Sequence, residues 1–152
     1  MFTNLRYLKL RQLHFISRNL LMETVKPQPT IKDYYNDSYL CTSFSRIIQV
    51  QKDEASPLKA SIILERTIFH PQGGGQPSDE GFIELKTPKN DKLIKFIVKE
   101  LIADRESDII LHKGEYAEDY GVFFEPNDEV KLTVNEEKRR LNARLHSAGH
   151  LI

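Results

Sequence analysis

The sequence contains a single cysteine, Cys41, among its 152 residues. One cysteine excludes an internal disulfide framework and favours a reducing compartment. No apolar run approaches the roughly 18 residues that cross a bilayer, so we expect no membrane partner. Net charge is also absent, because 22 basic residues balance 22 acidic ones. Bulk electrostatics therefore gives no reason to expect strong nonspecific nucleic-acid binding, and any RNA contact depends on a local patch or on sequence outside this chain.

Helical patterns of roughly 10–15 residues are missing between the apolar segments, which argues against parallel strands joined by helices. Instead, about six short apolar runs are separated by turn-like sequences, a pattern typical of a small all-β barrel. The expected strands are 39–50, 60–69, 81–85, 93–98, 109–112 and 130–134, and the expected turns or loops are 51–57, 87–91, 114–121 and 125–128. Alternation in the first strand predicts that its even-numbered apolar residues face the core, namely Leu40, Phe44, Ile48 and Val50.

Acidic residues are missing from residues 1–22, which carry basic residues and loosely amphipathic leucines. This composition fits a mitochondrial presequence, and it also fits an upstream extension without a targeting role, since Met22 offers a second start. Both interpretations stay open, so the expected location is cytoplasmic, or mitochondrial if the segment is a presequence. Pro27 and Pro29 then mark a linker. Residues 1–30 are therefore assigned to an N-terminal extension and linker.

The periodicity changes after Val134, where the barrel domain (31–134) is expected to end. Asn135 is a favourable N-cap, and the acidic residues that follow it suit the first turn of a helix. Apolar residues then recur at helical spacing, at Leu141, Leu145, Ala148 and Ile152. The sequence predicts that residues 135–152 form the first helix of a second, truncated domain.

His146 and His150 lie four residues apart on a different face of that helix. Imidazoles at this spacing project the same way and suit two ligands of a zinc ion. Two ligands do not complete a site, because a catalytic zinc usually has three protein ligands and an open position. Two solvated or packed histidines are the alternative. A His-Glu-x-x-His protease is disfavoured, because Ser147 occupies the position of its general base.

A second unusual string is the glycine-rich segment that contains Gly73, Gly74, Gly75 and Gln76. Consecutive glycines allow positive φ and the close approach of another molecule. No Gly-Lys-Ser/Thr follows, so the string is not a phosphate-binding P-loop. Its tripeptide Gly-Gly-Gln also occurs in peptide release factors, but Pro77 and the lack of a basic tail argue against that class. The alternative is a tight connection between barrel strands.

Taken together, the segments 69–81 and 142–151 resemble the freestanding alanyl-tRNA editing proteins (AlaX-like), relatives of the editing domain of alanyl-tRNA synthetase. The string Tyr-Asn-Asp-Ser-Tyr-Leu at 35–40 is also similar to the usual start of that family. The resemblance runs from about Tyr34 to the end of the chain. Two departures are Gly149, where some relatives have threonine, and His70, where an aromatic residue is usual.

The resemblance implies a small β-barrel followed by an α/β editing domain that holds one Zn²⁺. His146 and His150 correspond to metal ligands, and Gly73, Gly74, Gly75 and Gln76 to the glycine-rich motif that faces the substrate. The implied reaction is hydrolysis of tRNA(Ala) mischarged with serine or glycine. No catalytic residue is assigned beyond the metal ligands.

The family's remaining ligands, a cysteine and a histidine, lie further downstream and have no counterpart here, and Cys41 is at the wrong end of the chain to supply one. We therefore expect this chain to be incomplete and inactive alone. The alternative is a non-catalytic barrel module that binds tRNA or a synthetase.

Overall fold

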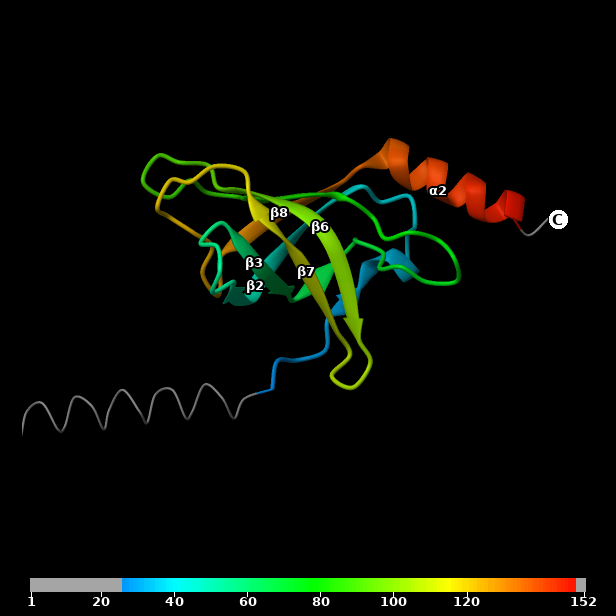
Figure 1. The fold of residues 1–152 in the computed structure, drawn as a ribbon, viewed down its shortest axis with the longest axis horizontal. Helices are drawn as coiled ribbons and strands as arrows, with labels where there is room; N and C mark the ends of the chain where they lie inside the picture. The colour runs from blue at the N-terminus through cyan, green and yellow to red at the C-terminus, as the bar shows by residue number, and fades with distance from the viewer. Residues whose placement is uncertain (1–25, 150–152) are drawn as a thin grey trace, which may run out of the picture.

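The computed structural model describes residues 26–149, so residues 1–22 and His150 lie outside the described residues. It is a small β-barrel followed by one helix (Figure 1). In chain order the elements are β1 (Ile31–Lys32), the 3₁₀ turn η1 (Asp33–Tyr35), β2 (Thr42–Lys52), β3 (Lys59–Leu64), β4 (Arg66–Thr67), β5 (Gly81–Leu85), β6 (Lys95–Asp104), β7 (Ile109–Tyr116), β8 (Glu129–Val134) and α2 (Glu136–Gly149).

Six strands close the barrel in the order β2-β3-β7-β6-β5-β8, and every neighbouring pair is antiparallel. The predicted fold class, mainly β with a barrel and a following helix, is confirmed. Aliphatic and aromatic side chains fill the interior, with Phe69 and Phe96 fully buried. Each such side chain contributes about 1.5–3 kcal/mol on burial. Outside the barrel, β1 and β4 form a short parallel pair.

The predicted inward face of β2 is wrong at Phe44, whose side chain is 56% exposed. Ser45 and Ile47, of opposite parity, are buried instead. A register shift between Ile47 and Gln49 then reverses the alternation, so that Val50 packs against the core again. The serine is tolerated inside because its hydroxyl exchanges two hydrogen bonds with the backbone of β4. A bulge of this kind leaves no clear trace in hydropathy.

Strands β6 and β7 are longer than predicted, and residues 114–116, expected to begin a loop, belong to β7. A Cβ on Gly114 would lie 1.9 Å from the carbonyl oxygen of Ile97, so only glycine permits the two strands to approach here. The glycine therefore marks a close contact inside the sheet and not a turn. The predicted turn at 87–91 is confirmed, with Asn90 and Asp91 at positive φ between bridged lysines.

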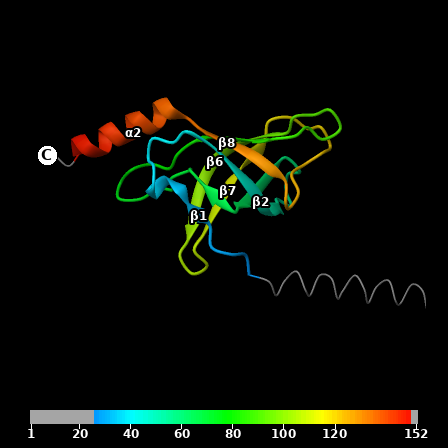
Figure 2. The same cartoon turned by 180° about the vertical axis from the view of Figure 1, so that it is seen from behind.

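Helix α2 projects beyond one end of the barrel, and the glycine-rich loop 70–79 and η1 lie at that same end in both views (Figure 1, Figure 2). The predicted N-cap is confirmed, because the Asn135 side chain accepts a hydrogen bond of 3.0 Å from the backbone N–H of Lys138. The apolar stripe of α2 faces outward, with Leu141 55% and Leu145 62% exposed. Ile152, the end of that stripe, lies outside the described residues.

Candidate functional site

The three glycines form a tight turn at the tip of loop 70–79. The backbones of Gly73 and Gln76 exchange two hydrogen bonds of 3.2 and 3.0 Å, which leaves Gly74 and Gly75 as the central residues. Their φ values are +58° and +87°. Two successive positive φ angles favour glycine strongly, because a Cβ strains this backbone conformation.

A buried carboxylate closes the base of the same loop. The backbone N–H of His70 donates to the Asp79 carboxylate at 2.7 Å, and the Asp79 N–H donates to the His70 carbonyl at 2.9 Å. Asp79 is only 2% exposed. A buried charge of this kind requires a partner of opposite sign.

That partner is Arg139 of α2, which is 9% exposed. Its Nε donates to both Asp79 oxygens at 3.2 Å, and its Nη2 donates to Asp79 and to the Ile68 carbonyl. Its Nη1 donates to the carbonyls of Ser38 and Leu40, at 3.1 and 3.0 Å. One guanidinium therefore joins α2 to the glycine-rich loop, to the residue after β4 and to the segment before β2.

His146 lies against the glycine turn. A Cβ built on Gly74 would be 3.8 Å from the His146 Cε1, and one on Gly75 would be 3.8 Å from its Nδ1. His146 and the two glycines line a cavity of about 450 Å³ between the loop and α2, together with Pro77 and Asn142. The two sequence motifs, more than sixty positions apart, thus meet at one place.

Asn142 stands one helical turn before His146 and is 7% exposed. Its amide nitrogen is buried and has no hydrogen-bond partner among the described residues. An unpaired buried donor costs about 1–3 kcal/mol, so such groups are rare away from ligand sites. Asn142 also lines the cavity of His146.

Two imidazoles at the spacing of His146 and His150 remain suitable zinc donors, but His150 lies outside the described residues. Within residues 26–149, no group of three or more His, Cys, Asp or Glu side chains is arranged to hold a metal. Cys41 lines a different cavity. Of the two predicted ligands, the described residues thus include only His146, beside the glycine turn.

His112 is not a candidate ligand, because it is fully buried in the barrel. Its ring nitrogens lie 2.7 Å from the Thr67 hydroxyl and 3.1 Å from the Ile62 carbonyl. Burial lowers the pKa of this imidazole to about 4, so the ring is neutral at physiological pH.

Sequence reasoning missed the roles of Arg139 and Asn142. Arg139 bonds to Asp79 and to three backbone carbonyls of distant segments, and a backbone carbonyl carries no residue-type pattern. Asn142 could have been noticed, because it precedes His146 by four residues and therefore shares its helix face. A further finding concerns membranes: between residues 26 and 149, no helix combines the length and the apolarity needed to cross one.

No protein-family model matches the chain. The alanyl-tRNA editing protein AlaX-L of Pyrococcus horikoshii is 32% identical over 119 residues, 78% of this chain and 26% of that protein. AlaX-M of the same organism is 30% identical over 123 residues, 81% of this chain and 47% of that protein. The chain is AlaX-like.

The AlaX-like chain is also 28% identical over 138 residues to the alanine–tRNA ligase of Saccharolobus islandicus, which is 90% of this chain and 13% of the ligase. Freestanding editing proteins and a synthetase thus share this segment. The chain spans about a quarter of AlaX-L and about half of AlaX-M.

Proposed function

We propose that the AlaX-like chain forms the barrel and first helix of a zinc-dependent trans-editing hydrolase. Its substrate would be tRNA(Ala) mischarged with serine or glycine. The observation that carries the proposal is the contact between His146 and the Gly74–Gly75 turn. An imidazole, a common zinc ligand, thus lies beside a backbone turn that has no side chains and leaves space for a substrate.

In this proposal His146 and His150 hold the zinc ion, with further ligands from outside the chain. A zinc ion held there would supply Lewis-acid chemistry toward the ester or a water molecule. The glycine turn forms one wall of the substrate space, and its lack of side chains lets the terminal ribose and the aminoacyl group approach. Gln76 follows the turn and lines a neighbouring cavity.

The role assigned to Asn142 is to bind the substrate through its unpaired amide N–H. Asn142 lines the cavity of His146, and we assign its buried amide nitrogen a hydrogen bond to an oxygen of the aminoacyl ester. A donor that is already buried needs little reorganisation when the substrate arrives.

The first test is hydrolysis of seryl-tRNA(Ala) by the complete gene product. His146→Ala should lower kcat/KM by on the order of a hundredfold or more, because a metal ligand is lost. Circular dichroism should show an intact barrel. Glu137→Gln, on an exposed position of α2, is the matched control and should keep full activity. Retained activity in His146→Ala would remove the catalytic assignment of this residue, and absence of hydrolysis by the wild-type gene product would favour the alternative, a non-catalytic module that binds tRNA or a synthetase.

A second prediction concerns Asn142→Ala in the same assay. Loss of one hydrogen bond to the reacting ester should reduce kcat by roughly ten- to a thousandfold, while unfolding by urea should be unchanged or shifted to higher urea, since an unsatisfied donor is removed. Asn127→Ala, in the turn at the other side of the barrel, serves as the control for tRNA hydrolysis. Unchanged turnover in Asn142→Ala would contradict the role given to this amide.

A further inference from the structure

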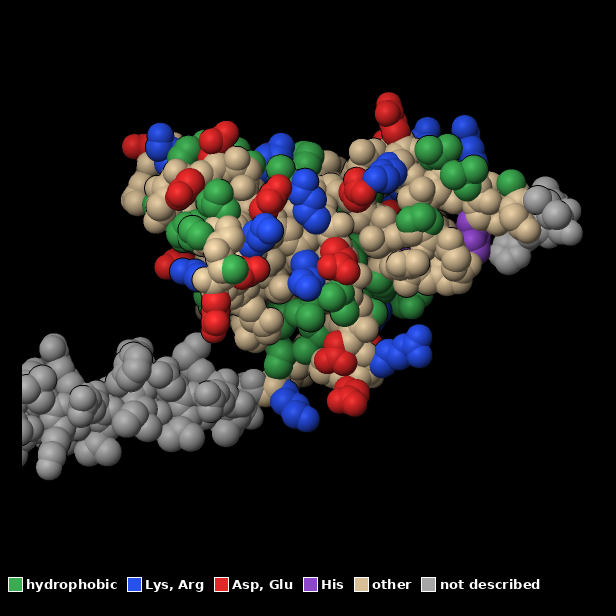
Figure 3. All heavy atoms as spheres, in the orientation of Figure 1, with side chains coloured by type: hydrophobic (Ala, Val, Ile, Leu, Met, Phe, Trp, Pro, Cys, Tyr) green, Lys and Arg blue, Asp and Glu red, His purple; other side chains and the backbone are tan. Residues whose placement is uncertain are grey.

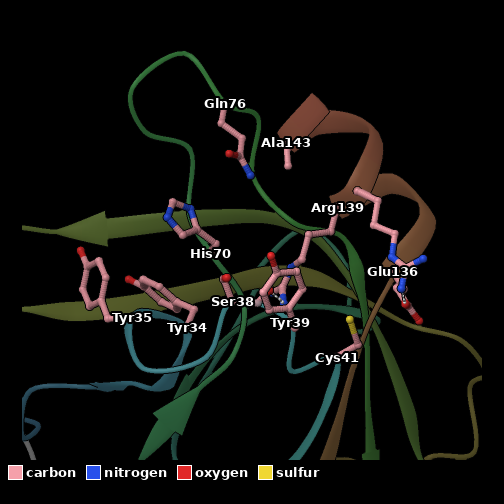
Figure 4. Close-up of a pocket in the computed structure, with 11 residues that line it drawn as sticks. Tyr34, Tyr35, Ser38, Tyr39, Cys41, His70, Gln76, Glu136, Arg139 and Ala143 are labelled. Carbon is pink, nitrogen blue, oxygen red and sulfur yellow. Dashed lines mark hydrogen bonds and ion pairs between the residues drawn. The ribbon is translucent and has the colours of Figure 1, made fainter. Parts of the chain in front are cut away.

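A second cavity, of about 420 Å³, lies on the other side of the glycine-rich loop. Tyr34, Tyr35 and His70 line one side of it, and Arg139 of α2 lies across from them (Figure 4). Tyr39 and Arg140 also belong to its lining. We refer to it as the tyrosine cavity. Neither the metal-ligand pattern nor the glycine motif accounts for these tyrosines.

The aromatic wall is built on a buried ring. Tyr34 is 5% exposed, and its ring centroid lies 4.7 Å from that of Tyr35 and 4.8 Å from that of His70. Tyr35 and Tyr39, in contrast, are 75% and 88% exposed. Burial raises the pKa of Tyr34, so its phenol carries no negative charge.

The exposed rings stand on fixed backbone. Arg139 holds the carbonyls of Ser38 and Leu40, the residues directly before and after Tyr39. The turn η1, which carries Tyr35, is tied to the barrel by an ion pair of 2.9 Å between Asp33 and Arg66. Two large apolar faces are thus presented to solvent with little backbone entropy left to lose on binding.

Charge at the mouth of the cavity comes from Arg140. The guanidinium of Arg139 is neutralised by Asp79, whereas Arg140 pairs with Glu136 at the surface, where their side chains are 67% and 52% exposed. An exposed pair of this kind contributes at most about 1 kcal/mol, so a phosphate can displace the carboxylate. The patch is local, in agreement with the mixed charges on the face of the barrel in Figure 3.

The tyrosine cavity adjoins the cavity of His146. Gln76 and Ala143 line the former, while Gly75 and Asn142, their neighbours in sequence, line the latter. Loop 70–79 and α2 are therefore walls shared by both. In Figure 4 the Gln76 side chain reaches from the loop toward the space above Tyr39. A single-stranded nucleic acid whose end lies at His146 can therefore continue around this loop into the tyrosine cavity.

We infer that the tyrosine cavity binds unstacked bases of a single-stranded RNA 3′ end whose terminal ribose occupies the His146 cavity. This inference rests on the proposed function. Proteins hold single strands by stacking bases on exposed aromatic rings and by placing cations near the phosphates. Tyr35 and Tyr39 supply the rings, Arg140 the cation, and the Gln76 amide a hydrogen-bonding group for a base edge.

The test is fluorescence anisotropy of this chain with a labelled seven-nucleotide RNA that has the 3′-terminal sequence of tRNA(Ala). Tyr35→Ala and Tyr39→Ala should each weaken binding by about five- to a hundredfold, the usual effect of removing one stacking ring. Tyr39→Phe should bind like the wild type, because the ring remains. Tyr120→Ala is the matched control, since this ring is also exposed, at 41%, but lies in segment 117–128 at the opposite end of the barrel (Figure 1).

Failure of the inference can be separated from failure of the proposed function. No binding by the wild-type chain, or wild-type affinity in both alanine variants, overturns the inference, and so does equal competition by a blunt RNA duplex. If His146→Ala abolishes hydrolysis in the complete gene product while the tyrosine variants bind normally, the proposed function stands and the tyrosine cavity has another occupant.

Discussion

At the residue scale, the glycine turn shows that neighbouring glycines differ in what they do. Gly74 and Gly75 have positive φ, whereas Gly73 does not, and a Cβ on Gly73 would meet nothing within 4 Å. We predict that Gly75→Ala destabilises the turn by about 1–2 kcal/mol, the cost of an L-residue in the left-handed region. Gly73→Ala should be neutral in the same urea unfolding experiment. Equal effects of the two substitutions would contradict this backbone assignment.

The same residues define what was predictable about the site. Spacing alone placed His146 on a helix, and glycine content alone suggested positive φ, because both arguments are local. That the two groups touch is a tertiary fact. Only the resemblance to editing proteins connected them beforehand. In the structure, a Cβ added to Gly74 or to Gly75 would lie 3.8 Å from the His146 ring.

At the scale of the element, α2 is fixed to the barrel chiefly through Arg139. Its guanidinium carries five donor hydrogens in a planar fork, and each nitrogen has an acceptor here. We predict that Arg139→Lys destabilises the protein by about 3–5 kcal/mol, because a single ammonium cannot reach all three segments and Asp79 is left buried with a poorer partner. Arg140→Lys, at an exposed position of the same helix, should change the urea midpoint little.

Elements were predicted well where hydropathy alternates cleanly, as in β5 and β8. The bulge in β2 was not predictable, because the register shift after Ile47 is decided by pairing with β3 and β8 and not by the strand itself. The loop predicted to begin at Gly114 was wrong for a related reason. Glycine usually marks a turn, but here the carbonyl of Ile97 occupies the space of its missing side chain. The ends of these strands therefore depend on pairing with strands distant in the sequence, which local hydropathy does not reveal.

At the scale of the whole molecule, the barrel contains a histidine that makes its stability depend on pH. His112 is sealed between β3 and β4 residues and has a pKa of about 4, below its ordinary value of 6.5. Between these two values the unfolded chain binds a proton that the folded chain excludes. The free energy of unfolding should therefore fall as pH drops below about 6.5, by up to about 1.4 kcal/mol per pH unit, and the contribution should be complete above that pH.

The measurement is urea unfolding from pH 7.5 to 5, compared between the wild type and His112→Gln. Glutamine cannot titrate, so the difference in free energy of unfolding between the two proteins should shrink with falling pH. Groups common to both proteins cancel in this difference. If His112→Gln does not fold, the NMR shift of the His112 ring in the wild type gives the same answer: it should stay that of neutral imidazole down to pH 5. A ring that titrates near 6.5 would contradict the buried, neutral state on which this pH dependence is based.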